Sequence, residues 1–146
     1  MKRIILFLAG LTAAFALASC TSDIEKTQIS GTATAPQLEN IASINITADN
    51  LATGTCTFQW KSADFGAPTE IVYTLIAAYG GKTSVLFDNL TGVSYQAGYA
   101  ELSPKLTDLG VPSGVDAKVD FHLSCTIGST YRSIESNTVS TTVHID

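Results

Sequence analysis

The chain has 146 residues, of which 45% are hydrophobic, and its 13 acidic residues outnumber its 8 basic residues, which gives a formal net charge of −5. This length suits one domain. An acidic chain with dispersed charge is poorly suited to binding nucleic acid or anionic lipid headgroups, so neither is expected as a partner.

The first twenty residues carry the most informative pattern in the chain. Lys2 and Arg3 supply a basic start, residues 4–17 form an apolar span, and Ala18 and Ser19 are small. This is the pattern of a secretory signal peptide. The apolar span is too short between its flanks to be a membrane-spanning helix.

The run Leu-Ala-Ser-Cys at residues 17–20 resembles the lipobox of bacterial lipoproteins. In that family the cysteine thiol is diacylated, the peptide is cut before it, and the new amino group is acylated. The resemblance implies that residues 1–19 are a lipoprotein signal peptide and that Cys20 anchors the mature chain through lipid. The alternative is a soluble secreted protein cut near Ala18, with Cys20 left as a spare thiol.

The segment after the anchor is polar. Removing the signal leaves 146 − 19 = 127 residues with a formal charge of 6 − 13 = −7. Residues 20–35 contain few large apolar side chains, which predicts a flexible tether ahead of a domain at 36–146. Asp23 and Glu25 resemble the acidic signal for export to the cell surface in Bacteroidota lipoproteins, although a solvated tether explains the same residues.

Beyond Pro36 the sequence predicts short strands separated by turn residues. Residues 55–60 place Cys56, Phe58 and Trp60 on one face and polar residues on the other, the period of a half-buried strand. A Gly-Gly pair at residues 80–81 predicts a hairpin turn. Residues 62–69 are expected to form a loop, and the strands predicted in this part are 37–41, 43–48, 55–60, 70–79, 83–88 and 93–99.

One helix is predicted, over residues 103–110. Ser103 suits the N-cap, Pro104 the first helical position and Gly110 the C-terminal cap. Its apolar face, expected to pack against a sheet edge, consists of Leu102, Leu106 and Leu109.

Two further alternating segments follow the helix, at residues 119–127 and 139–145, with a turn near 128–130. About seven strands within roughly 110 residues predict an all-β fold, an antiparallel β-sandwich with one short helix.

Cys56 and Cys125 both fall on the inner faces of strands predicted to be central. In an exported chain, a disulfide between them would close a loop of about 70 residues and contribute at most roughly 4 kcal/mol. We therefore predict a structural disulfide. The alternative is two buried free thiols, because cysteine is often buried without bonding.

Several segments together resemble the first domain of SusE-type outer-membrane lipoproteins. They are residues 57–66 (TFQWKSADFG), 72–75 (VYTL), 101–102 with 106–110 and Pro112, and the closing 136–143 (SNTVSTTV). The resemblance covers roughly residues 36–145 and implies an immunoglobulin/fibronectin-III-like sandwich. It also implies a surface lipoprotein of a Bacteroidota polysaccharide-utilisation system, beside a TonB-dependent transporter and its glycan-binding lipoprotein partner. SusE-type proteins continue into further β-sandwich domains that hold the glycan, whereas this sequence stops at Asp146.

A direct glycan site would need an exposed aromatic platform with polar groups beside it. Trp60 falls on the core face and is expected to be a packing anchor, as is Tyr73. Phe65 and Tyr79, near loops or strand ends, are the candidates for glycan binding. The other aromatic residues near loops or strand ends, Tyr95, Tyr99 and Tyr131, are expected to pack at edges.

Catalysis has little support in the sequence. His122 and His144 alternate outward with Asp120 and Asp146 nearby, which would form a metal site only if the strand register joined them. No catalytic motif occurs, so we predict no enzyme, no cofactor and no metal. Two hypotheses remain: a non-catalytic contact module of a polysaccharide uptake system, or a small glycan-binding lipoprotein that holds polysaccharide directly.

Overall fold

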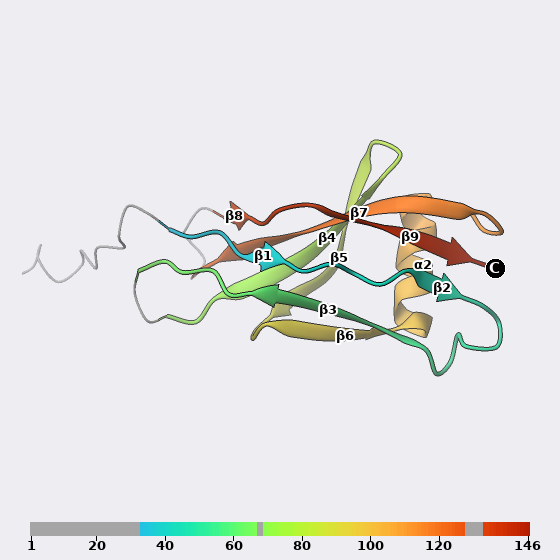
Figure 1. The fold of residues 1–146 in the computed structure, drawn as a ribbon, viewed down its shortest axis with the longest axis horizontal. Helices are drawn as coiled ribbons and strands as arrows, with labels where there is room; N and C mark the ends of the chain where they lie inside the picture. The colour runs from blue at the N-terminus through green and yellow to red at the C-terminus, as the bar shows by residue number, and fades with distance from the viewer. Residues whose placement is uncertain (1–32, 67–68, 128–132) are drawn as a thin grey trace, which may run out of the picture. The chain divides into compact units, whose positions relative to one another are not determined.

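A computed structural model describes residues 33–66, 69–127 and 133–146, which belong to a compact unit spanning Thr32–Asp146. Two β-sheets and one helix make up this unit (Figure 1). The elements are β1 (Gln37–Leu38), β2 (Ile44–Ile46), β3 (Thr55–Lys61), β4 (Val72–Tyr79), β5 (Lys82–Leu90), β6 (Ser94–Gly98), α2 (Tyr99–Leu109), β7 (Asp116–Thr126), β8 (Ile134–Glu135) and β9 (Val139–Ile145).

The strand order is that of an immunoglobulin/fibronectin-III-like sandwich. One sheet has the order β1-β3-β6, and the other has the order β2-β9-β7-β4-β5, with β8 paired to β7. The predicted fold class is therefore confirmed. The pairing departs from a wholly antiparallel one at β2, which runs parallel to β9.

The parallel pair arises because the first part of the chain crosses between the sheets. β1 pairs with β3 in one sheet, and β2 pairs with β9 in the other. Asn137 secures the crossing, since its Oδ1 accepts from the Leu38 N–H at 2.7 Å and its Nδ2 donates to the Leu38 carbonyl at 3.0 Å. The Thr141 hydroxyl donates to the Ile41 carbonyl at 2.9 Å. Hydrogen bonds from side chains thus satisfy the backbone groups where the strand pairing is interrupted.

The core lies between the sheets and follows the predicted alternation. β3 buries every second side chain, and β7 does the same along its length. Phe58 of β3 meets Phe121 of β7 with ring centroids 5.6 Å apart, and Trp60 of β3 meets Tyr73 of β4 at 5.3 Å. Trp60 and Tyr73 are core residues, as predicted.

The helix is longer than predicted and begins earlier. It starts at Tyr99, directly after the N-cap residue Gly98, so Pro104 lies inside it rather than at its first position. Burial explains the difference, because the three leucines Leu102, Leu106 and Leu109 anchor α2 on both sides of Pro104. Gly110 ends the helix in the left-handed conformation, as predicted.

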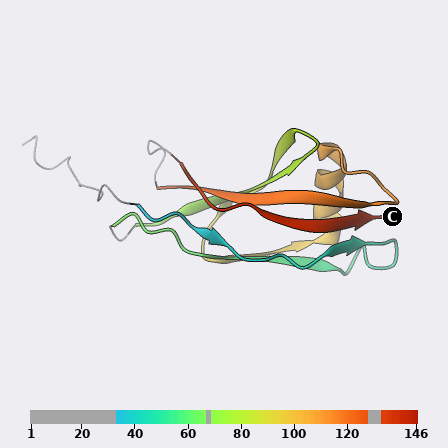
Figure 2. The same cartoon turned by 45° about the horizontal axis from the view of Figure 1, so that its top comes forward.

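α2 packs against β4, β5 and β6. Figures 1 and 2 both show it crossing the strands near the end of β9. On the neighbouring strands, Phe87 of β5 lies 4.7 Å from Tyr95 of β6, and the Lys105 ammonium of α2 sits 5.2 Å from the Phe87 ring. These contacts join β5 and β6, which belong to different sheets.

Candidate functional site

Phe65, one of the two predicted glycan-binding residues, is buried and only 3% exposed. The prediction for Phe65 is therefore wrong. Its segment was expected to be a loop, but Asp64 forms a backbone bridge to Thr34, and this bridge holds Ala63 and Phe65 inward. The same bridge shows that the domain already includes Thr34, ahead of the expected boundary at Pro36.

Tyr79, the other candidate, is partly exposed at the hairpin end of β4, opposite Lys82. It lies far from Phe65, because Tyr73 contacts the Ala63 N–H and Tyr79 is six residues further along β4. At the rise of a β-strand, six residues span roughly 20 Å. The structure does not bring the two predicted residues together.

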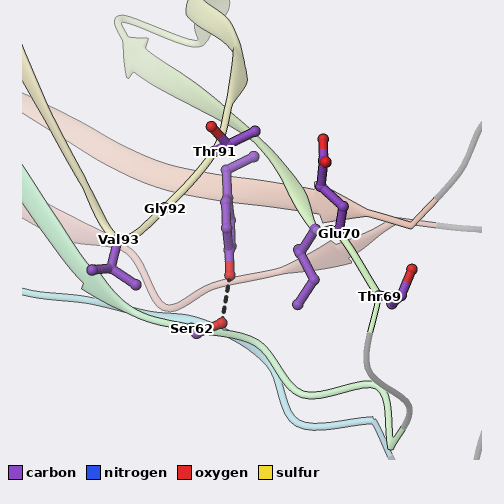
Figure 3. A pocket seen from close by; sticks show the side chains of 8 residues that line it. Ser62, Thr69, Glu70, Thr91, Gly92 and Val93 are labelled. Carbon is purple, nitrogen blue, oxygen red and sulfur yellow. Dashed lines mark hydrogen bonds between the residues drawn. The ribbon is translucent and has the colours of Figure 1, made fainter.

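A cleft of about 260 Å³ opens where β4 begins and the β5–β6 connection passes (Figure 3). Its lining combines hydroxyl groups, one carboxylate and two apolar side chains. The residues are Ser62, Thr69, Glu70, Ile71, Tyr73, Thr91, Gly92 and Val93. Sequence reasoning missed this cleft, because its residues come from three separate segments.

A closed set of hydrogen bonds fixes one wall of the cleft. The Ala63 N–H donates to the Tyr73 hydroxyl oxygen at 3.0 Å, and the Ser62 hydroxyl donates to the Ala63 carbonyl at 3.0 Å. Since the Ser62 proton is committed there, the Tyr73 hydroxyl donates to the Ser62 oxygen, 3.0 Å away. The Ser62 oxygen can therefore only accept a hydrogen bond from a ligand, whereas the Tyr73 hydroxyl is buried and is used within this set.

This arrangement suits binding better than catalysis. No histidine lines the cleft to activate the Ser62 hydroxyl as a nucleophile, and that hydroxyl is already hydrogen-bonded. The Ser62 oxygen, the Glu70 carboxylate and the apolar Ile71 and Val93 would together receive a group that carries several donors.

The structure corrects the predicted disulfide, because Cys56 and Cys125 are both buried and free. Phe58 faces Phe121, and two residues further along β3, Trp60 contacts Tyr73, whose register partner is Cys125. β3 and β7 therefore run in the same direction.

The register keeps the two cysteines apart. Cys56 precedes Phe58 by two residues, whereas Cys125 follows Phe121 by four. The separation along the strands is about 20 Å, and a disulfide needs Cα atoms within about 7 Å. Burial raises the pKa of each thiol to about 11, so both stay protonated and unreactive near neutral pH.

Each histidine instead pairs with carboxylates on the outer face of the larger sheet. His144 lies between Asp116, 2.7 Å from Nδ1, and Asp146, 3.1 Å from Nε2. The hydrogen bond to Asp116, and then that to Asp146, raises the pKa of His144. The sequence showed that His144 and Asp146 share a face, but only the β7–β9 register adds Asp116.

His122 belongs to a different part of that face. It lies 3.4 Å from Glu135, six residues along β7 from Asp116, or roughly 20 Å from the His144 cluster. Asp120 bonds to Ser140. The strand register thus keeps His144 and Asp146 apart from His122 and Asp120. Within the described ranges, no three His, Cys, Asp or Glu side chains are placed so that they could hold a metal ion together.

Cys20, the signal and most of the tether lie outside the described residues, as does Tyr131. Among the helices that the structure does describe, none has the length and apolar character needed to cross a membrane.

Comparison with known proteins decides the family. The family model "SusE outer membrane protein" matches residues 22–124, well over half of the chain. The chain belongs to the SusE outer membrane protein family. The match starts earlier than the segments that suggested the resemblance and ends before β8 and β9.

The other comparisons add little to this assignment. No curated protein matches the chain. An Fn3-like protein from Clostridium thermocellum has a crystal structure similar to this chain, with 18% identity and a TM-score of 0.39, over 75% of this chain and 95% of that one. The fold assignment rests on the strand order described above and not on this similarity.

Proposed function

We propose that this SusE-family chain is a lipid-anchored, cell-surface contact module, without catalytic activity, of a polysaccharide binding and uptake system. Residues 1–19 act as the signal, Cys20 carries the lipid, and residues 20–35 tether the sandwich to the outer membrane. The single observation that carries this proposal is the SusE family match over residues 22–124. Its partners are a TonB-dependent transporter and the glycan-binding lipoprotein beside it.

Two structural features support a contact role. Phe65 and Tyr79 do not form the predicted aromatic platform, because Phe65 is in the core. The outer face of the larger sheet, in contrast, presents a mixed row in which Ile76 lies between Val85 and His122. Val85 is 53% exposed there. Exposed apolar groups bordered by polar ones are typical of protein-contact surfaces.

Cys20→Ala tests the anchor. The variant is expected to lose incorporation of labelled palmitate and to leave the membrane fraction, whereas Cys56→Ala keeps both. Protease treatment of intact cells would then degrade the wild-type chain if it faces outward. A Cys20→Ala chain that stays in the membrane fraction would overturn the lipid anchor.

The contact role is tested by affinity purification of the tagged full chain from outer-membrane extracts. We expect the transporter and its lipoprotein partner to co-purify with the wild-type chain. A Val85→Asp variant, which places a charge on the exposed row, should reduce that recovery, whereas Thr91→Asp in the cleft should not. Recovery of the chain alone would contradict the proposal.

A second candidate function is direct glycan holding, and the cleft at Ser62, Glu70 and Tyr73 is the observation that favours it. Sugar hydroxyls could donate to its acceptors while a ring face rests on Ile71 and Val93. Affinity electrophoresis against a polysaccharide panel decides between the candidates. Retardation that Glu70→Gln abolishes, and Glu39→Gln leaves unchanged, would establish a glycan site.

A further inference from the structure

A hollow of about 250 Å³ opens at the end of the sandwich where β2 and β9 finish. It lies between β2, the turn after β2, α2 and the end of β9, and its residues include Ile46, Thr47, Leu51, Ser103, Ile145 and Asp146. Figures 1 and 2 both show these segments together near the C-terminal end of β9. This end hollow is separate from the cleft at Ser62, because the two share no residue.

The end hollow has an apolar floor and a partly polar rim. Ile46 and Ile145 are register partners, and both are buried. Leu51 remains 40% exposed at the rim, although a leucine side chain gains free energy when it is buried. The Ser103 hydroxyl and the Asp146 carboxylate supply the polar part. The hollow therefore offers contact to an apolar group that has a polar neighbour.

The wall that carries Leu51 is held by hydrogen bonds. The Thr47 N–H donates to Asn50 Oδ1 at 2.8 Å, and Asn50 Nδ2 donates to the Asn45 carbonyl at 2.9 Å. The Gly54 N–H donates to the Asn50 carbonyl at 2.7 Å, so both sides of the turn are fixed. A site whose walls are fixed before binding loses less entropy when a ligand enters.

The volume of the end hollow limits what it can receive. Pockets for small organic ligands usually measure about 300–1,000 Å³, and the end hollow is below that range. Protein segments are instead commonly recognised through a few anchor side chains that enter such depressions. One large aliphatic side chain matches both the size of the hollow and its apolar floor.

The charges around the end hollow select a basic partner segment. Asp146 lines the hollow, and Asp49 is exposed in the turn after β2. Residues 43–51 and 142–146 contain no lysine or arginine. The lysine of α2, Lys105, lies over an aromatic ring of β5 instead. An approaching segment therefore meets carboxylates at the rim, and these attract lysine or arginine.

We propose that the end hollow binds a protein segment in which one large aliphatic side chain lies beside a lysine or arginine. The aliphatic group enters between Leu51 and Ile145, and the cation lies at Asp146 and Asp49. This inference goes beyond the proposed function, whose contact row at Val85 lies on the outer face of the larger sheet. The two surfaces can therefore be tested separately.

The probe is a synthetic peptide, acetyl-Gly-Lys-Leu-Arg-Gly-amide, added to the mature full chain in nanodiscs of zwitterionic lipid. Methyl NMR should show saturable shifts at Ile46, Leu51 and Ile145. Peptides with glutamate at both basic positions, or with serine at the leucine position, should not produce them. No saturable shift with the basic peptide, or equal shifts with the acidic one, would overturn the proposal. Shifts of the same methyl groups when the protein alone is concentrated would show that a second copy fills the hollow, and would overturn it too.

Two variants locate the binding. Leu51→Ser should weaken peptide binding roughly fivefold, because it removes one apolar wall, and it should keep the fold because Leu51 is exposed. Val115→Ser is the matched control, since Val115 is 52% exposed just before β7 but does not line the hollow. Asp146→Asn should weaken binding about two- to threefold, whereas Asp88→Asn on β5 should not. Unchanged affinity in Leu51→Ser would contradict the proposal.

The pH gives a readout that a purely structural role of Asp146 would not produce. Protonated His144 offsets part of the negative charge, because its Nε2 is 3.1 Å from Asp146 and its Nδ1 is 2.7 Å from Asp116. On β2 its register partner, Asn45, is uncharged, and the other charged neighbour is Lys118, two residues along β7. Peptide affinity should therefore rise as the pH increases through the pKa of His144, which Asp116 and then Asp146 raise above 6.5. His144→Gln should remove this rise, and a wild-type affinity that is flat or falls would count against the cation site at Asp146.

Discussion

The two sheets of this sandwich are held together in different ways. The larger sheet is a continuous backbone ladder whose central strand, β7, has 11 residues and is paired on both sides. The smaller sheet has one strand of 7 residues flanked by strands of 2 and 5. It depends on side chains that cross to the larger sheet. This difference predicts that the smaller sheet opens first when a crossing contact is lost.

Removing the aromatic contact at the centre of the sandwich should have the largest effect on the free energy of unfolding. Phe58→Ala removes the ring that meets Phe121, and we expect a loss of about 3–5 kcal/mol in the free energy of unfolding. Denaturant unfolding measures the loss. Amide exchange should accelerate more in β3 and β6 than in β4 and β7. Equal acceleration in both sheets would show that they open as one unit.

Val85→Ala provides the matched comparison. Val85 is 53% exposed on the larger sheet, and its truncation should change the free energy of unfolding by less than about 0.5 kcal/mol.

Removing the hydrogen bonds that hold the crossing between the sheets should have the second-largest effect on the free energy of unfolding. Asn137→Ala leaves the N–H and the carbonyl of Leu38 without their side-chain partners, and Leu38 is buried. We expect a loss of about 2 kcal/mol in the free energy of unfolding, with faster exchange in β1. Thr138→Ala, an exposed neighbour, should be nearly neutral. An Asn137→Ala variant as stable as the wild type would show that backbone pairing alone holds β1.

The hydroxyl of Tyr73 is a smaller link between the sheets. Tyr73→Phe leaves the Ala63 N–H without its partner, and Ala63 is buried. The expected loss is about 1–2 kcal/mol in thermal or denaturant unfolding. Tyr79→Phe is the control, because Tyr79 is partly exposed. Equal losses in the two variants would contradict the role assigned to the Tyr73 hydroxyl.

The His144 cluster lies within the larger sheet and should produce only a small, pH-dependent effect. Asp116 and then Asp146 raise the pKa of His144 above 6.5. The charged form is therefore favoured by folding. Its contribution is complete below pH 6.5 and is lost as the pH rises through the higher pKa of the folded state. The unfolding midpoint should fall over that range in the wild type.

His144→Gln should flatten this dependence of the unfolding midpoint on pH, whereas His122→Gln, which leaves the cluster intact, should preserve it. A slope unchanged by His144→Gln would assign the pH dependence to another group.

The state of the two thiols should have the smallest effect on stability. Because Cys56 and Cys125 are free, adding a reductant should leave the melting temperature unchanged. With pKa values of about 11, both thiols should react with a thiol reagent at neutral pH only after unfolding. A melting temperature that falls with reductant would instead show that the predicted disulfide forms.

Local patterns predicted the elements of this fold well. Alternation in residues 55–60 predicted β3, because burial of one strand face follows the local period of two. The Gly-Gly pair at residues 80–81 predicted the β4–β5 hairpin, because its turn needs positive φ angles. The start of the helix was predicted less well, because burial of Leu102 outweighed the capping preference of Ser103. Phe65 was misplaced for a similar reason, as the Asp64–Thr34 bridge is not a local signal.

By itself, the sequence determined the class of the fold, the pattern of buried positions and the resemblance to the SusE family. These properties depend on residue periodicity and on motifs that are read along the chain. Only the tertiary structure decided which inward-facing residues meet. It places Phe121 opposite Phe58 and keeps Cys125 away from Cys56. The physical reason is that periodicity fixes the face of a strand, whereas register and sheet order arise from contacts between distant segments.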